Sequence, residues 1–444
     1  MTTIMGPLGK EEGANLLLNK IARSVFCLYL FATVIDATGS GLISTIPGIG
    51  ISVKYLLSAV LCLLFIARVI TFLMGKGFPE NHFRWNIVSL VSFSIFFVIV
   101  GLLRGNETGF VLKDALGFFY YLAAFVLFPF YEKNEDIFPL LKALFFSAIL
   151  VSFVLISVEY LLVSGRISSI PVGLFLLESQ LGFLTGIGEH FFRLHIRSGI
   201  FIQIAVAISY SLLAYKQEVK GVFRWTMLCA GLAALFITFS RGFWLGLLAS
   251  AFLATLMLMR NANVKGMAVA FVLTLFAFSF FLGVSGASLG GVFGDRFFSS
   301  FNFTDNPSNL VRAWQFSELQ EKALDHPVIG SGYGAYLESY SKDVEHPFLY
   351  ELDYVSMVMK FGVGGFLVLC SIFFSILRKE YLFLALVRDR KIKAVATGIF
   401  VSQIGLLVTG ATNPYMNGIL GNLIVILGMV SFNTFMNDKG LERA

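Results

Sequence analysis

Charged residues are scarce in this 444-residue chain: Asp, Glu, Lys and Arg make up 14% of it, whereas hydrophobic residues make up 57%. Because soluble domains carry about a quarter charged residues, this composition excludes a water-soluble globular protein. Cysteine is also rare, and no CxxC pair occurs. The cysteines all lie within apolar runs, at Cys27, Cys62, Cys229 and Cys370. This spacing excludes a disulfide framework and a zinc site, and we expect neither a metal nor a cofactor.

A separate soluble domain is also missing, so we expect one integral membrane domain over residues 1–444. The polar segment 1–20 lacks a small-residue cleavage site, which favours a cytoplasmic tail over a signal peptide. The net charge of +6 does not indicate nucleic-acid binding, because the basic residues gather mainly at the ends of apolar runs.

Long apolar runs recur along the whole chain, each long enough to cross about 30 Å of hydrocarbon. They predict an all-α polytopic membrane protein with about twelve transmembrane helices. The expected spans are 24–44, 51–74, 85–103, 111–131, 137–163, 198–215, 225–240, 242–259, 266–285, 353–377, 394–411 and 417–436.

The distribution of Lys and Arg predicts the orientation, because these residues favour cytoplasmic loops. Nineteen of the 33 fall on one side of the expected spans, and this side includes both termini. Two long loops then lie outside the cytoplasm: a first outer loop at 164–197 and a large loop at 286–352. Loops of this length inside a compact protein are usually functional.

The large loop is expected to be partly helical, because NPSNLVRAWQFSELQEKAL has an N-cap signal and apolar residues at helical spacing. The glycine-rich GSGYG that follows does not fit a nucleotide-binding loop, since no strand precedes it.

Arginines gather on the predicted outer face. Arg241 lies within the apolar stretch LFITFSRGFWLGLLAS, in a turn between two expected spans. Arg197 opens another span at the same level, and Arg312 lies in the large loop. A guanidinium matches phosphate oxygens with a fork of donors, so these residues predict a pyrophosphate clamp. The alternative is that each arginine reaches to the membrane interface or caps a helix.

A transporter or flippase is the alternative from another functional class to an enzyme that binds a pyrophosphate. Such proteins often contain inverted repeats and charged or broken helices at mid-membrane. No convincing repeat is visible, and we count few ionisable residues inside the spans, namely Arg68, Lys142 and Glu159. The large one-sided loop favours chemistry at the membrane surface.

Several stretches resemble one superfamily, in order, over roughly residues 190–375. TFSRGFWLGLLAS resembles the SRG-A-W-L-G signature of the O-antigen ligase and O-antigen polymerase (Wzy-type) superfamily, and RSGIF resembles its R-x-x-G-like motif. NLVRAWQFSELQEKALDHPVIGSGYGAY resembles the R-x-x-W…P-h-x-G-x-G-x stretch of its large outer loop. YELDYVSMVMKFGVGGFLVL resembles the segment that re-enters the membrane.

The resemblance implies a GT-C-like, metal-independent glycosyltransferase in a bacterial inner membrane, with its active site on the periplasmic side. The donor would be a glycan on undecaprenyl pyrophosphate, and the acceptor a lipid-linked glycan for a polymerase or lipid A core for a ligase. The products would be surface polysaccharides such as O-antigen, capsule or exopolysaccharide. A chain-length regulator and a flippase are candidate partners.

One position separates the two branches. Ligases of the superfamily carry a histidine before the glycine that restarts the membrane span, and the matching position, eleven residues before Gly362, is Glu351. A carboxylate there resembles the polymerases, and Glu351 would accept a proton from the attacking hydroxyl. Alternatively, Glu351 and Asp353 only complement a helix N-terminus.

We therefore predict polymerase activity, with ligase activity as the alternative. Glu351, Arg241 and Arg197 are the expected catalytic residues. The expected substrate-binding residues are Arg312, Arg193, His346 and Asp353. Further polar residues near Arg197 that either contact sugar or face water are Glu189, His190 and His195.

Overall fold

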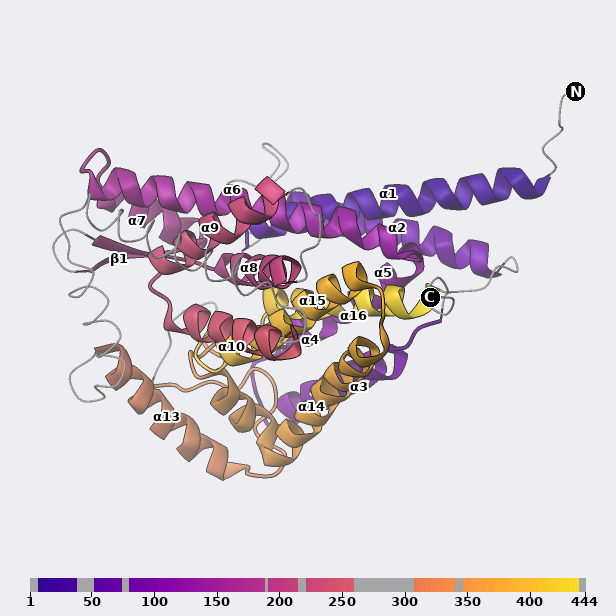
Figure 1. Ribbon diagram of the computed structural model, residues 1–444. Coiled ribbons are helices and arrows are strands. Elements are labelled where there is room, and N and C mark those ends of the chain that lie inside the picture. Colours follow the sequence, from indigo (N-terminus) through magenta and orange to yellow (C-terminus); the bar gives the residue numbers. More distant parts are fainter. Residues whose placement is uncertain are drawn as a thin grey trace, which may run out of the picture.

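The computed structural model describes residues 7–37, 52–73, 80–187, 191–214, 221–258, 307–339 and 346–438. These residues form a bundle of helices with one two-stranded antiparallel hairpin (Figure 1). The helices are α1 (Pro7–Ile35), α2 (Val53–Leu73), α3 (Arg84–Leu103), α4 (Thr108–Phe119), α5 (Leu122–Leu127), η1 (Phe128–Phe130), η2 (Asn134–Asp136), α6 (Ile137–Val163), α7 (Ser169–Glu178), α8 (Gly199–Ala214), α9 (Gly221–Ile237), α10 (Arg241–Leu258), α13 (Pro307–Asp325), α14 (Asp353–Leu386), α15 (Arg390–Gly410) and α16 (Ile419–Asn437).

The all-α membrane fold predicted from the sequence is confirmed. Among the described residues, seven helices are long and apolar enough to cross a membrane, and α4 with α5 and η1 forms an eighth candidate bent by 41°. The shorter apolar helices α8, α9 and α10 coincide with three further predicted spans. The predicted span 266–285 lies outside the described residues, so the number of twelve stays a prediction.

The first helix differs from its prediction. We expected a span at 24–44 behind a polar tail, but α1 already begins at Pro7 and its apolar window starts at Leu16. The tail sequence contains Lys, Glu, Ala and Leu, which favour helix. Because helix propagation is cooperative, the helix extends through this segment.

Helices α15 and α16 form the centre of the bundle, with 78% and 83% of their span residues buried. Helices α8 and α10 pack on α15 through small residues, since any side chain at Gly246 or Gly405 would overlap the neighbouring helix. The Thr409 hydroxyl donates to Gln203 Oε1 on α8 at 3.0 Å. Small residues and interhelical hydrogen bonds are what hold helices together in lipid.

Helix α14 is broken at Gly362, whose φ of 66° and ψ of 173° interrupt the helix. The segment before α14 fills the break: Val363 N donates to Pro327 O at 2.8 Å, and Gly364 N donates to Val328 O at 3.1 Å. Helix α13, predicted from the sequence of the large loop, packs on α14 and continues into this segment.

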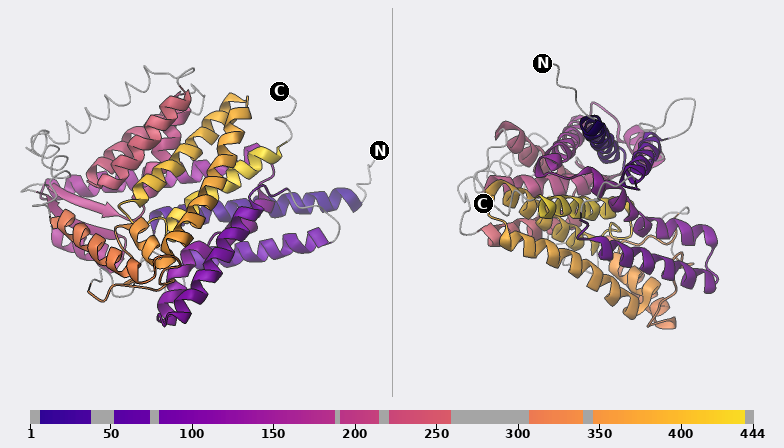
Figure 2. Two further views of the ribbon diagram at one scale, coloured as in Figure 1. Left: turned by 90° about the horizontal axis from the view of Figure 1, so that it is seen from below. Right: turned by 90° about the vertical axis from the view of Figure 1, so that its right-hand side faces the viewer.

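The hairpin was not predicted. It consists of β1 (Gly182–Ile187) and β2 (Phe191–Ile196), paired so that Gly182 lies opposite Ile196 and Thr185 opposite Arg193. The sequence FFRLHI carries the signal in its alternation of apolar and polar residues from Phe192 onward, which is typical of a half-buried strand. The hairpin and α13 lie at the same end of the molecule in Figures 1 and 2.

Candidate functional site

Arg197 stands at the junction of the hairpin and α8. Its backbone N–H donates to Leu181 O at 3.0 Å, and its side chain is exposed. The Tyr415 hydroxyl, from the turn 411–418 between α15 and α16, donates to the Arg197 carbonyl at 3.2 Å. Burial raises the pKa of Tyr415, which keeps the hydroxyl protonated and able to donate.

Arg241 is the first residue of α10 and is partly exposed. The chain reverses from α9 into α10 through Phe239, a non-glycine residue with φ of 46°. The next residue, Gly242, faces the side chains of Thr412 and Asn413, and a Cβ there would overlap both. The N-terminus of α10, with its arginine, is therefore packed directly against the turn 411–418.

A row of aromatic rings joins the hairpin to the same turn. Phe183 stacks on His195 with centroids 4.8 Å apart, His195 stacks on Phe243 at 5.7 Å, and Phe243 lies 5.9 Å from Tyr415. The ring of Phe243 is so close to Gly199 that any side chain at this position would overlap it. The N-termini of α8 and α10 thus lie side by side, one beside Arg197 and the other beside Arg241.

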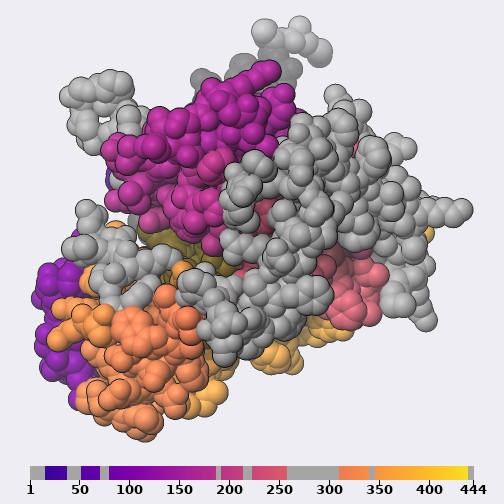
Figure 3. Space-filling view, turned by 90° about the vertical axis from the view of Figure 1, so that its left-hand side faces the viewer, coloured from indigo at the N-terminus to yellow at the C-terminus, as the bar shows by residue number. Residues whose placement is uncertain are grey.

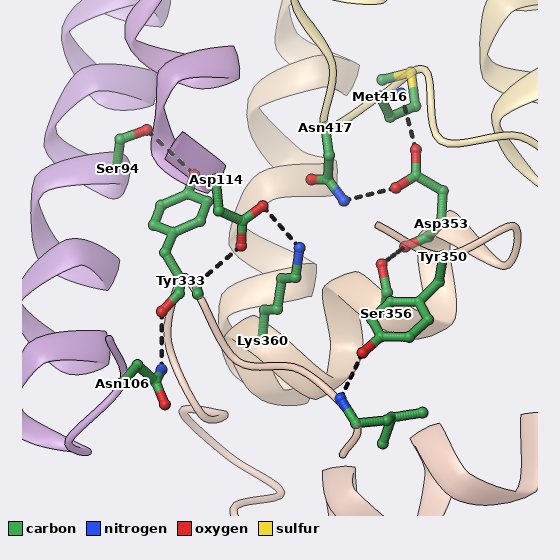
Figure 4. Close-up of polar contacts among 12 residues, drawn as sticks. Ser94, Asn106, Asp114, Tyr333, Tyr350, Asp353, Ser356, Lys360, Met416 and Asn417 are labelled. Carbon is green, nitrogen blue, oxygen red and sulfur yellow. Dashed lines mark hydrogen bonds and ion pairs between the residues drawn. The ribbon is translucent and has the colours of Figure 1, made fainter. Parts of the chain in front are cut away.

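Asp353 binds residues at the C-terminal end of the turn 411–418. This first residue of α14 is fully buried, and its carboxylate accepts from Met416 N at 2.8 Å and from Asn417 Nδ2 at 2.6 Å (Figure 4). Both carboxylate oxygens bind the chain here and so couple the start of α14 to the turn. The substrate-binding role that the sequence suggests for Asp353 stays a prediction.

Glu351, two residues before α14, forms an ion pair with Arg312 of α13. The Arg312 Nε lies 3.0 Å and its terminal nitrogen 2.9 Å from Glu351 Oε2. Each side chain is 25% exposed, so the pair is open to a ligand. The structure thus brings together two residues that the sequence analysis chose independently. Asp353 connects the segment of Glu351 to the turn 411–418, which contacts the segments of Arg197 and Arg241.

The structure also describes the predicted residues Arg193, on β2, and His346, in the segment before α14. The Arg193 guanidinium lies 5.2 Å from the centroid of the Phe183 ring on the hairpin. The ring of His346 packs edge-on against Phe348 at 5.8 Å. Glu189 and His190 lie outside the described residues. In Figure 3, magenta atoms near the hairpin and orange atoms of α13 lie on one face, with yellow atoms of the C-terminal part visible between them.

The sequence analysis missed a buried ion pair between α4 and α14. Lys360 Nζ lies 2.8 Å from Asp114 Oδ1, and both side chains are almost fully buried (Figure 4). Asp114 Oδ2 also accepts from Gly334 N at 3.0 Å. Our count of ionisable residues inside the spans omitted both residues. The signal was present, since VLKDALGFF places two charged residues and VSMVMKFG places one inside an apolar run.

The GSGYG segment has a structural role. Ser331 N donates to Met359 O at 3.0 Å, Gly332 N to Lys360 O at 2.7 Å, and Tyr333 N to Phe97 O at 3.2 Å. Tyr333 is fully buried, and Asn106 Nδ2 donates to its carbonyl at 2.8 Å. Because these backbone N–H groups are bonded within the protein, they do not form a phosphate cradle.

Metal ligands are not clustered in the described part of the chain, where no three His, Cys, Asp or Glu side chains come together. The predicted residues described above bring together arginines, a carboxylate ion-paired with one of them and helix N-termini. Such a set suits an anionic substrate.

The middle of the chain is similar to a known protein family. Residues 225–370 match the family model described as O-antigen ligase. The match includes Arg241, Arg312, Glu351 and Asp353, and it confirms the resemblance to the O-antigen polymerase and ligase superfamily. No curated protein matches the chain. The chain is thus a multi-pass membrane protein that is similar to this family over residues 225–370.

Proposed function

We propose that this protein polymerises a surface polysaccharide by transferring a glycan from undecaprenyl pyrophosphate to a lipid-linked glycan acceptor. The observation that carries the proposal is the partly exposed ion pair between Arg312 on α13 and Glu351. Glu351 lies two residues before Asp353, which binds the turn 411–418. The ion pair supplies a cation and a carboxylate at one place, as a transfer from a pyrophosphate requires.

The pyrophosphate is proposed to bind where helix N-termini meet. The helices α8, α10 and α14 begin beside the turn 411–418, and α16 begins immediately after it. Each helix N-terminus carries about half a positive charge and favours anions. Arg197 and Arg241 add full charges at two of these ends. This arrangement supports their assignment to the phosphates of the donor and disfavours a role as isolated interface anchors.

The proposed reaction is an in-line displacement. An acceptor hydroxyl attacks the anomeric carbon of the donor, and the bond from that carbon to the pyrophosphate oxygen breaks. Glu351 accepts the hydroxyl proton, and the arginines stabilise the charge that develops on the departing undecaprenyl pyrophosphate. Arg312 orients the Glu351 carboxylate through its two nitrogens. The anomeric configuration inverts. The reaction takes place on the extracytoplasmic side of the inner membrane.

Ligase activity is the second candidate, and a specific observation favours it: the matching family model is described as O-antigen ligase. The residue at the position of the ligase histidine favours the polymerase, because it is Glu351 here. His346 lies five residues earlier and packs on Phe348.

Complementation separates the two activities. The wild-type gene is expressed in a polymerase-null strain and in a ligase-null strain, each supplied with the matching glycan pathway, and polysaccharide is resolved on a gel. We expect a ladder of repeat units in the polymerase-null strain only. Attachment of preformed polymer in the ligase-null strain, without a ladder in the other, would show that the protein is a ligase.

A further inference from the structure

One face of α13 packs against the segment that carries Glu351. Arg312, Gln315 and Leu319 share this face, because residues three and four apart on a helix are neighbours. Arg312 binds Glu351, and Leu319 is buried in a cluster with Tyr350 and other apolar residues. The inner face of α13 is therefore held on both sides of Gln315, by Arg312 before it and by Leu319 after it.

Gln315 itself is fully buried, and among the described residues neither its Oε1 nor its Nε2 has a hydrogen-bond partner. A buried amide without partners costs free energy, and native structures contain few of them. Leu or Met would fill a similar volume in this apolar cluster without that cost. Packing of the resting protein therefore does not explain why the position is a glutamine.

We propose that Gln315 is a specificity-determining residue that binds hydroxyl groups of the acceptor glycan beside the Arg312–Glu351 pair. The inference rests on the proposed function, in which Glu351 accepts the proton of an acceptor hydroxyl. Gln315 lies about 4.5 Å along the helix axis from Arg312, so the sugar ring that reaches Glu351 is within range of its amide.

The chemistry of the amide suits a sugar. Its oxygen accepts and its NH₂ donates, and a sugar hydroxyl does both. Because the amide is closed off in this arrangement, entry of the glycan requires the part of α13 around Gln315 to shift away from Tyr350 while Arg312 keeps its contact with Glu351. In the part of the chain that the structure describes, the polar contacts of α13 beyond Arg312 include Lys322 Nζ with Tyr336 O at 2.5 Å and Ser339 Oγ with Glu318 Oε2 at 3.0 Å.

Replacing Gln315 by leucine distinguishes a glycan contact from a packing residue. If Gln315 only packs, Gln315→Leu should raise the melting temperature in detergent and leave polymerisation unchanged. If it binds sugar, the melting temperature should stay equal or rise, while the half-saturating concentration of lipid-linked repeat unit should increase at least tenfold. The matched control is Gln320→Leu, the same change on the exposed side of α13, which should alter neither quantity.

Gln315→Met serves as a second variant in case the branched leucine disturbs the packing. An unchanged half-saturating concentration in either folded variant would overturn the inference. A wild-type protein that forms no ladder would contradict the proposed polymerase activity instead. If that protein attaches polymer in the ligase-null strain, the same comparison is made with lipid A core as acceptor, and the same outcomes apply.

Discussion

Tyr415 donates its hydroxyl to the Arg197 carbonyl across 3.2 Å, although 218 positions separate the two residues in the chain. The same tyrosine ring lies 5.9 Å from Phe243, two residues after Arg241. One side chain of the turn 411–418 thus contacts both segments that carry the arginines proposed to bind pyrophosphate. The relative position of these segments depends on this turn.

Removal of the Tyr415 hydroxyl should disturb Arg197 without unfolding the protein. Tyr415→Phe keeps the ring contacts but loses a hydrogen bond of about 1 kcal/mol, so we expect polymerisation to fall about fivefold at a normal membrane level. The rate of ladder formation by purified protein measures this. Tyr210→Phe, which removes a hydroxyl contact to Thr255 at the other end of α8, is the control and should retain activity. Equal activity of the two variants would contradict a positioning role.

Glu351→Gln tests the proton acceptor. Glutamine keeps an oxygen for Arg312 but does not take a proton at neutral pH, so turnover should fall by about 10² or more. Glu338→Gln, on an exposed part of the same loop, should be neutral. The double variant Arg312→Glu/Glu351→Arg restores an ion pair with the charges exchanged. Recovery of polymerisation in that variant would mean that the pair is only structural.

Arg241→Lys retains charge and loses the two-pronged geometry that matches phosphate oxygens. We expect impaired polymerisation for Arg241→Lys and none for Arg241→Ala, with both proteins at normal levels in the membrane. Arg378→Ala removes an exposed arginine from the far part of α14 and should have no effect. Normal polymer from Arg241→Ala would identify the residue as an interface anchor.

The Asp114–Lys360 pair should be essential for stability as a pair. Removing one partner from a buried ion pair typically costs about 3–5 kcal/mol because a charge stays buried alone. Asp114→Asn and Lys360→Met should each lower the melting temperature, and the double variant should lie closer to wild type than either. The exposed Lys142→Met controls for loss of a lysine. Additive losses in the double variant would argue against the coupling.

Orientation is tested by labelling single cysteines in a variant whose native cysteines are replaced. Ser339→Cys, on an exposed part of the large loop, should react with a membrane-impermeant thiol reagent in cells with a permeable outer membrane. Arg388→Cys, exposed between α14 and α15, should react only after the inner membrane is opened. The reverse pattern would place the large loop in the cytoplasm and contradict the periplasmic site.

The spans and α13 could be predicted because their signals are local. Twenty apolar residues in a row indicate a span by themselves, and Pro307 does begin α13, as proline at a first helical position indicates. Gly362, used to align the ligase histidine with Glu351, also marks a real interruption of α14. Its positive φ favours glycine.

The contacts that assemble the site could not be predicted in this way. Asp353 binds residues 63 and 64 positions later, and Lys360 pairs with a residue 246 positions earlier. No periodicity within a helix reports such distances. The turn 411–418 was expected only as a short connection between two spans, and nothing in its own sequence shows which segments it contacts.

The turn 411–418 also matters for protein engineering. The segment that matches the O-antigen ligase family, 225–370, contains Arg241, Glu351 and Asp353 but ends before this turn and begins after the hairpin. A chimera that grafts only that segment into a relative would separate Asp353 from Met416 and the start of α10 from Tyr415. On the proposed function, we therefore expect an exchange of sugar preference to require residues 182–197 and 411–418 together with the graft.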